Sequence, residues 1–119
     1  MLNLDTHIVI FAMSGALRPS ERELLSADRW SMSSIVLWEL AKLSQLGRVD
    51  IDLDDREVVS ALNRIHMWPL DLVIARESTR LDFDGDPADE IIAATSVVHS
   101  VPLLTRDRVM RRSKVVPLA

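Results

Sequence analysis

The chain has 119 residues, 48% of them hydrophobic and 27% charged, and its formal net charge is −4. This length fits one domain, residues 1–119, with a single core, and the composition excludes general disorder. The absence of cysteine excludes disulfide scaffolds, thiolate metal sites and thiol catalysis, and it suits a reducing cytoplasm. No apolar run approaches the roughly 18 residues that span a bilayer, so we expect no membrane association.

Short apolar runs alternate with helical patterns along the chain. In chain order, the pattern predicts strands over residues 2–5, 30–33, 67–70, 101–104 and 115–118, with helical segments over 6–13, 18–27, 34–46, 54–65, 71–81 and 87–100 between them. Short apolar strands that alternate with helices favour an α/β fold, in which helices cover both faces of a parallel sheet. Ligands of such sheets bind beyond the C-terminal ends of the strands.

Two acidic residues stand just past the predicted ends of strands. Asp5 closes the first strand, and Asp107 follows the strand over residues 101–104 after Thr105 and Arg106. Each acid could instead cap the helical segment behind it, and for Asp5 alone the two interpretations are about equally good. The repeated placement favours a shared ligand site at this edge of the sheet, where Thr105 could orient a carboxylate or a metal-bound water.

Glu39 lies in an apolar helical segment, residues 35–41, where its neighbours on the helix include Ile35 and Leu43. An ionised carboxylate on an apolar face is costly unless a cation pairs with it. Lys42 is the only basic residue close to it along the helix, so the partner must come from elsewhere. We favour a metal ion over a distant arginine, because unpaired buried acids are rare.

Asp86 and Asp89 stand at the start of the helix predicted over residues 87–100. An N-cap acid, a proline in the first turn and a second acid at the third position make a good helix start that needs no chemistry. The apolar segment 91–94 follows directly, however, so both acids lie at the rim of the core and not on an open surface.

The distribution of charge decides whether this acidic chain can approach nucleic acid. The candidate acids are Asp5, Glu39, Asp86, Asp89 and Asp107. If they form one cluster, the rest of the chain carries 14 basic and 13 acidic residues, a net charge of +1. Five basic residues lie within nine positions around the last acid, namely Arg106, Arg108, Arg111, Arg112 and Lys114. They form either an ordinary solvated basic surface or a basic surface that borders a cation-binding pocket of acids. Hydrolysis of a phosphodiester would require the second arrangement.

The chain resembles the PIN domain in four ordered motifs: Leu4-Asp5-Thr6-His7; Trp38-Glu39-Leu40; Asp86-Pro87-Ala88-Asp89 with Ile92-Ala93-Ala94; and Leu104-Thr105-Arg106-Asp107. More narrowly, it is similar to the VapC-like toxin nucleases of type II toxin–antitoxin systems. The resemblance covers residues 2–118, essentially the whole chain. It implies a three-layer α/β/α fold with a central parallel sheet.

The same resemblance implies a cytoplasmic, Mg²⁺- or Mn²⁺-dependent endoribonuclease that a small antitoxin protein neutralises. Oxygen donors without cysteine or a histidine cluster also favour Mg²⁺ or Mn²⁺ over zinc. By position, the catalytic and metal-binding acids are Asp5, Glu39, Asp89 and Asp107, and the accessory residues are Asp86, Thr6 and Thr105. The residues expected to contact RNA are Arg106, Arg108, Arg111 and Arg112. A homodimer, and operator DNA bound only through the antitoxin, are implied as well.

Two other interpretations remain open at this point. A phosphoacceptor receiver domain has similar length, sheet and Mg²⁺-binding acids, and Asp71 could imitate its phosphoacceptor. It would need an acid pair after the first strand and a lysine after the fifth, whereas Asp5 stands alone and the only lysines are Lys42 and Lys114. A non-catalytic α/β binding module, whose acids all cap helices, is disfavoured by Glu39.

Overall fold

Four parallel strands form the centre of the computed structural model, which describes every residue from 1 to 119. The strands are β1 (Leu2–Leu4), β2 (Trp30–Ser33), β3 (His66–Trp68) and β4 (Leu103–Leu104), and their order in the sheet is β3-β2-β1-β4. The helices are α1 (Thr6–Ser14), α2 (Pro19–Ser26), α3 (Ile35–Gln45), α4 (Arg56–Asn63), α5 (Leu72–Glu77), α6 (Pro87–His99) and α7 (Arg108–Arg111).

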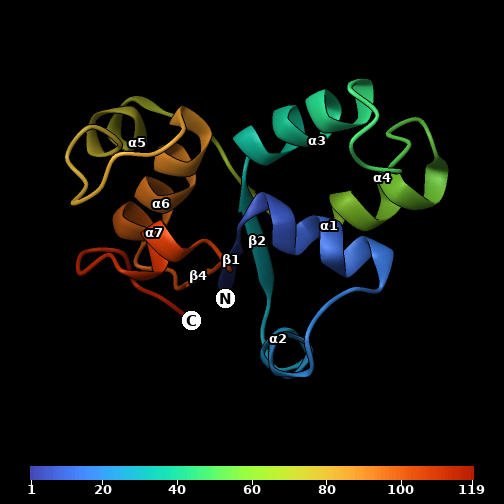
Figure 1. Cartoon of the computed structure of the whole chain (residues 1–119), viewed down its shortest axis with the longest axis horizontal. Helices are drawn as coiled ribbons and strands as arrows, with labels where there is room; N and C mark the ends of the chain where they lie inside the picture. Colours follow the sequence, from blue (N-terminus) through green and yellow to red (C-terminus); the bar gives the residue numbers. More distant parts are fainter.

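Helices lie on both sides of this sheet, with α1, α3 and α4 on one side and α5, α6 and α7 on the other (Figure 1). The predicted three-layer α/β/α architecture is therefore confirmed. Burial of the apolar strands on both faces builds one core, in which Leu4, Met32, Leu103 and Ile92 are fully enclosed. No helix is both long and apolar enough to cross a membrane.

The register of the sheet brings the ends of β1 and β4 level with each other. Leu4 pairs with Leu104, and the backbone N–H of Asp5 donates to the Leu104 carbonyl at 3.1 Å. The residues that follow these two strands consequently leave the sheet at the same edge, as the parallel arrangement requires.

Asn3, a polar residue in the centre of β1, joins the sheet to α6. Its side chain is fully buried, and Nδ2 donates to the Ile92 carbonyl at 3.1 Å and to Ser96 Oγ at 2.9 Å. Because buried amides are costly unless they are bonded, these contacts fix the position of α6 against β1.

The C-terminal segment departs from the prediction of a fifth strand over residues 115–118. Only a single bridge pairs Leu103 with Leu118, held by Leu103 N–H to the Pro117 carbonyl and Ala119 N–H to the Leu103 carbonyl. Pro117 has no N–H to extend a ladder, so the segment does not form a strand. The short helix α7, which the sequence patterns left as a polar segment, instead follows β4.

Candidate functional site

Asp5 lies at the junction of β1 and α1, and both of its carboxylate oxygens are bonded. Oδ1 accepts from the Thr6 N–H at 2.8 Å, and Oδ2 accepts from Thr105 Oγ1 at 2.6 Å. The residue is only 3% exposed. Burial raises the pKa of Asp5 above its ordinary value, the two hydrogen bonds oppose that shift, and the negative charge of Asp107 adds to it.

Glu39 projects from the second turn of α3 toward the same place. Its Oε1 accepts a hydrogen bond from the Thr6 hydroxyl. Burial raises the pKa of Glu39, and the charges of Asp5 and Asp86 raise it further. The two ion pairs of the chain join other residues, so the arginine alternative for Glu39 is excluded. A neutral hydroxyl leaves the charge of this carboxylate uncompensated.

Asp89, in the first turn of α6, is the point at which these charges converge. Burial and then the charges of Asp5 and Glu39, followed by smaller effects from Asp107 and Asp86, raise the pKa of Asp89 to about 7. Burial is the largest of these effects, and the four like charges each add to it. The five candidate acids of the sequence therefore lie in one electrostatic cluster.

Asp107 and Asp86 both precede helices, but only one of them caps its helix. Asp107 Oδ1 accepts from the backbone N–H groups of Val109 and Met110, at 2.9 and 3.0 Å, as the capping interpretation predicts. Asp86 occupies the N-cap position of α6 without any capping bond from its side chain, and it is exposed, so the prediction that it lies at the rim of the core is wrong, whereas Asp89 is partly buried as expected. Asp5 is likewise the N-cap of α1, with Oδ1 on the Thr6 N–H. Capping thus accounts for Asp107 and for one oxygen of Asp5 but not for Asp86, Asp89 or Glu39, and the interpretation that all the acids are caps is wrong.

Two threonines connect the acids through their hydroxyl groups. Thr105 Oγ1 donates to Asp5 and accepts from the Asp107 N–H at 3.0 Å. Thr6 donates to Glu39 from the first turn of α1. The hydroxyls thereby join the ends of β1 and β4 to α3, which orients two carboxylates that would otherwise repel each other.

His7 and Asn3 belong to this region although the sequence patterns assigned neither a role. His7 is exposed beside Asp5 and Glu39, and positive charge on its ring lowers the pKa of both carboxyls. Its place next to Asp5-Thr6 in the first helical turn was the available signal. Asn3 fixes α6, and the signal there was a single amide within an otherwise apolar strand.

The chemistry of the donor set fits a divalent cation with a preference for oxygen. The cluster offers only carboxylates and hydroxyls, and the raised pKa of Asp89 reflects negative charge that a cation would relieve. As the side chains stand, no three histidine, aspartate or glutamate residues lie close enough together to grip one ion. Ligation would therefore require carboxylates of the cluster to move closer together.

The basic residues beside Asp107 divide into two groups. Arg108, Arg111, Arg112 and Lys114 are exposed. Arg111 Nη1 donates to the Thr105 carbonyl at 3.2 Å. Arg106 is bound in an ion pair with Glu21, so the expectation that it offers a free guanidinium to RNA is not supported by its contacts.

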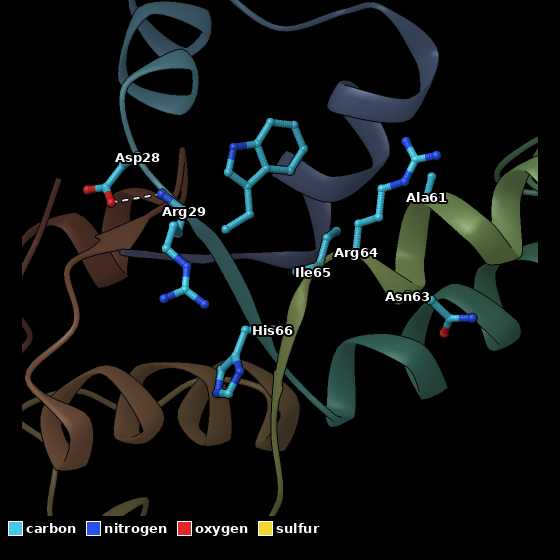
Figure 2. A pocket seen from close by; sticks show the side chains of 8 residues that line it. Asp28, Arg29, Ala61, Asn63, Arg64, Ile65 and His66 are labelled. Carbon is cyan, nitrogen blue, oxygen red and sulfur yellow. Dashed lines mark hydrogen bonds between the residues drawn. The ribbon is translucent and has the colours of Figure 1, made fainter.

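A separate pocket of about 540 Å³ lies at the N-terminal ends of β2 and β3, opposite the strand ends that carry the acids. Arg29, Trp30, Arg64 and His66 are among the side chains around it (Figure 2). None of the candidate acids lines it, so the site of the acids and this pocket are distinct.

Asp71, the residue that could imitate the phosphoacceptor of a receiver domain, has a local structural role. Its Oδ1 accepts from the Ile74 N–H at 3.0 Å as the N-cap of α5, and the residue is exposed. The charge of Asp71 is not among those that shift the pKa values of Asp5, Glu39 and Asp89, and the receiver interpretation is not favoured.

Comparison with known proteins finds similarities that extend over most of the chain. The family model described as "PIN domain" matches residues 3–115. Ribonuclease VapC22 of Mycobacterium tuberculosis is 28% identical over 117 residues, covering 91% of this chain and 88% of that protein.

Solved structures with a similar fold include a toxin–antitoxin complex from Klebsiella pneumoniae, with a TM-score of 0.66 and 22% identity over 90% of this chain and 87% of that chain. VapBC2 from Rickettsia felis, bound to a DNA fragment from its promoter, gives a TM-score of 0.73 and 20% identity over 100% of this chain and 98% of that chain. At these identities the structural likeness establishes the fold.

Proposed function

The chain belongs to the PIN domain family, and on that premise we propose that it is a Mg²⁺- or Mn²⁺-dependent endoribonuclease, the toxin of a toxin–antitoxin pair. The observation that carries the proposal is the convergence of charge on Asp89, whose pKa is raised to about 7 by burial and by Asp5, Glu39, Asp107 and Asp86. Repulsion among crowded carboxylates destabilises the folded chain, and a bound divalent cation would offset that repulsion.

Asp5, Glu39 and Asp89 are the residues that would hold the principal metal, and Asp107 would complete that site or hold a second ion. A divalent ion bound there would acidify a water molecule and offset the negative charge that develops on the phosphoryl group. Thr105 and Thr6 donate hydrogen bonds to the carboxylates of Asp5 and Glu39, and these bonds restrict the directions in which the two carboxylates can turn.

RNA would approach over the exposed basic residues Arg108, Arg112 and Lys114, which lie beside Asp107. Their positive charges attract phosphates, so binding should weaken as the salt concentration rises. Arg111 borders the same region through its bond to the Thr105 carbonyl. The basic residues position the backbone, and the acids lie where the phosphodiester would be cut.

The partners of the proposed toxin follow from proteins with the same fold. The Klebsiella protein was solved as a toxin–antitoxin complex, and the Rickettsia VapBC2 was solved on promoter DNA. We extend this to a small antitoxin protein that neutralises the chain and carries it to operator DNA. A homodimer, and action on RNA in the cytoplasm, belong to the same proposal.

Cleavage of RNA by the purified chain tests the enzymatic part of the proposal. We expect cleavage with Mg²⁺ or Mn²⁺, none in EDTA, and none from Asp5→Asn or Asp89→Asn, although both variants should remain folded. Asp84→Asn, a change at an exposed loop acid, is the matched control and should cleave as the parent does. Retained activity in both Asp5→Asn and Asp89→Asn would reject the assigned roles.

Expression in cells tests the toxin part. The chain should arrest growth, and co-expression of the small protein encoded beside it should restore growth. Growth arrest that persists in the Asp89→Asn variant would separate toxicity from nuclease activity and contradict the proposal.

A further inference from the structure

Arg106 is the most constrained basic side chain of the molecule. Nε donates to Glu21 Oε2 at 2.8 Å and Nη2 donates to Glu21 Oε1 at 2.6 Å, so two parallel bonds join the guanidinium to the carboxylate. Glu21 is only 5% exposed, and its Oε1 also accepts from the Arg18 N–H at 2.7 Å. Arginine and carboxylate planes that meet in this way have one preferred relative orientation.

Two further contacts hold the same guanidinium from other sides. Its carbon lies 3.9 Å from the centre of the Phe11 ring, and Nη2 donates to the Ala16 carbonyl at 3.2 Å. A cation over an aromatic face is attracted by the ring quadrupole. The end of α1, the first turns of α2 and the segment after β4 therefore meet at one side chain.

The segment that Arg106 fixes contains Asp107, a member of the carboxylate cluster, and Thr105, which is bonded to another member. Thr105 precedes it and bonds Asp5 at 2.6 Å, and Asp107 follows it with its N–H on Thr105 Oγ1. One peptide bond on either side separates them from the clamped residue. Movement of the Arg106 side chain would therefore move both Thr105 and Asp107 relative to Asp5.

We propose that the Glu21–Arg106 pair is a positioning clamp, which sets the place of Thr105 and Asp107 relative to Asp5 by tying the segment 105–107 to α2. The inference deepens the proposed function and rests on it. Arg106 acts through its neighbours and does not touch RNA, although it lies in the basic segment that approaches the substrate.

Stabilisation of the fold does not by itself explain why Glu21 and Arg106 form an ion pair here. A partly buried ion pair loses hydration energy, and apolar replacements of similar volume are often neutral or stabilising. What an arginine–carboxylate fork provides is a fixed direction, which lysine does not reproduce because its ammonium is a point charge on a flexible stem. Arg106→Lys therefore keeps the charge and removes the orientation.

The test compares kcat, KM, Mn²⁺ affinity and metal-free RNA binding in the full chain. Arg106→Lys should lower kcat by about tenfold or more, because displacement of reacting groups by about 1 Å is that costly, while KM stays within about twofold. Calorimetry should show weaker Mn²⁺ binding, by about threefold or more, because Asp107 is misplaced. Binding of an intact RNA oligonucleotide in EDTA, followed by fluorescence anisotropy, should be unchanged.

Three further variants make the result specific. The double variant Glu21→Leu with Arg106→Leu leaves no unpaired charge and should fold with a similar melting temperature, yet show the same loss of kcat and of Mn²⁺ affinity. Arg64→Lys, at the pocket near the N-terminal ends of β2 and β3, should behave as the parent in every measurement. Arg112→Ala should show the opposite pattern, with weaker RNA binding in EDTA and unchanged Mn²⁺ affinity.

Each contrary result has a defined meaning. If Arg106→Lys weakens metal-free RNA binding as Arg112→Ala does, Arg106 contacts the substrate and the positioning role is wrong. If Arg106→Lys and the double leucine variant match the parent in kcat and Mn²⁺ affinity, the Glu21–Arg106 pair does not position Thr105 and Asp107, and the proposal is wrong. If the parent cleaves no RNA, the proposed function fails, and the Mn²⁺ affinities of the variants still decide the clamp.

Discussion

Asp89 carries the clearest physical signature of the site, a pKa raised to about 7 from an ordinary 3.8 by burial and by four neighbouring carboxylates. The folded chain therefore binds a proton at Asp89 more tightly than the unfolded chain does. This contribution to stability is fully present below about pH 4, declines as the pH rises, and is lost once the pH passes about 7. Above that pH the folded state contains an unfavourable ionised Asp89.

Thermal denaturation in EDTA checks this sign. Asp89→Asn should have a higher melting temperature than the parent near pH 8, because the amide carries no charge, and the two should converge as the pH falls toward about 4. A melting temperature for Asp89→Asn that is lower than that of the parent near pH 8 would show that the other acids do not crowd this carboxyl.

Individual site residues differed in how far the sequence could predict them. Asp5 and Asp107 were found from their place after strands, and Glu39 from its apolar helix face. The partner of Arg106 could not be found, because Glu21 lies 85 residues away and the pairing depends on how α2 packs against the end of β4. Asp89 was found as a residue, but its pKa depends on distances that only the folded chain sets.

At the scale of elements, α7 gives Asp107 two separable roles, because this residue both caps the helix and belongs to the cluster. Asparagine caps helices as well as aspartate does but carries no charge, whereas alanine removes the cap at a cost of about 1 kcal/mol. Asp107→Asn should therefore keep the free energy of unfolding and lose RNA cleavage. Asp107→Ala should lose cleavage and also about 1 kcal/mol of the free energy of unfolding.

Chemical denaturation and cleavage assays on both variants separate these effects. Asp107→Ser, which restores a capping oxygen without the charge, is the control and should resemble Asp107→Asn. RNA cleavage at the rate of the parent by either uncharged variant would mean that Asp107 only caps α7 and has no role in the carboxylate cluster.

The packing of α6 on β1 depends on Asn3, whose amide bonds Ser96 and the Ile92 carbonyl. Asn3→Ala should destabilise the chain by about 1–3 kcal/mol, because it leaves buried polar groups without a partner. It should also reduce cleavage, since α6 carries Asp89. A double-mutant cycle with Ser96→Ala measures the coupling, and fully additive losses of stability would show that the two side chains do not act together.

Most elements were predicted from apolar periodicity and helix starts, and β1, β2, α3 and α6 lie where they were expected. The predicted last strand failed, because Pro117 and the short overlap with β4 leave only one bridge. The short helix α7 has one turn, too little to produce a periodic pattern, and only its capping aspartate marked it.

At the scale of the whole molecule, the acidic excess of the chain is concentrated in one place. Outside the five clustered acids the net charge is +1, so an acidic protein can still present a basic approach to a polyanion. The fold produces this separation by placing residues from β1, α3, α6 and the β4–α7 segment at one edge of the sheet.

Divalent cations should stabilise the whole chain by binding the folded state alone. An ion at about 100 times its Kd adds about 2.7 kcal/mol, so Mg²⁺ or Mn²⁺ should raise the melting temperature of the parent. Asp89→Asn should lose most of this rise, and NaCl at matched ionic strength should not reproduce it. An equal rise in Asp89→Asn would place the responsible cation elsewhere.

The position of a bound Mn²⁺ ion tests the central claim most directly. We predict that anomalous scattering from crystals soaked in Mn²⁺ will locate an ion among the carboxylates of Asp5, Glu39 and Asp89, with Asp107 beside it, and none in Asp89→Asn. Saturating Mn²⁺ that leaves these carboxylates without an ion, or that binds only at other residues, would contradict the account.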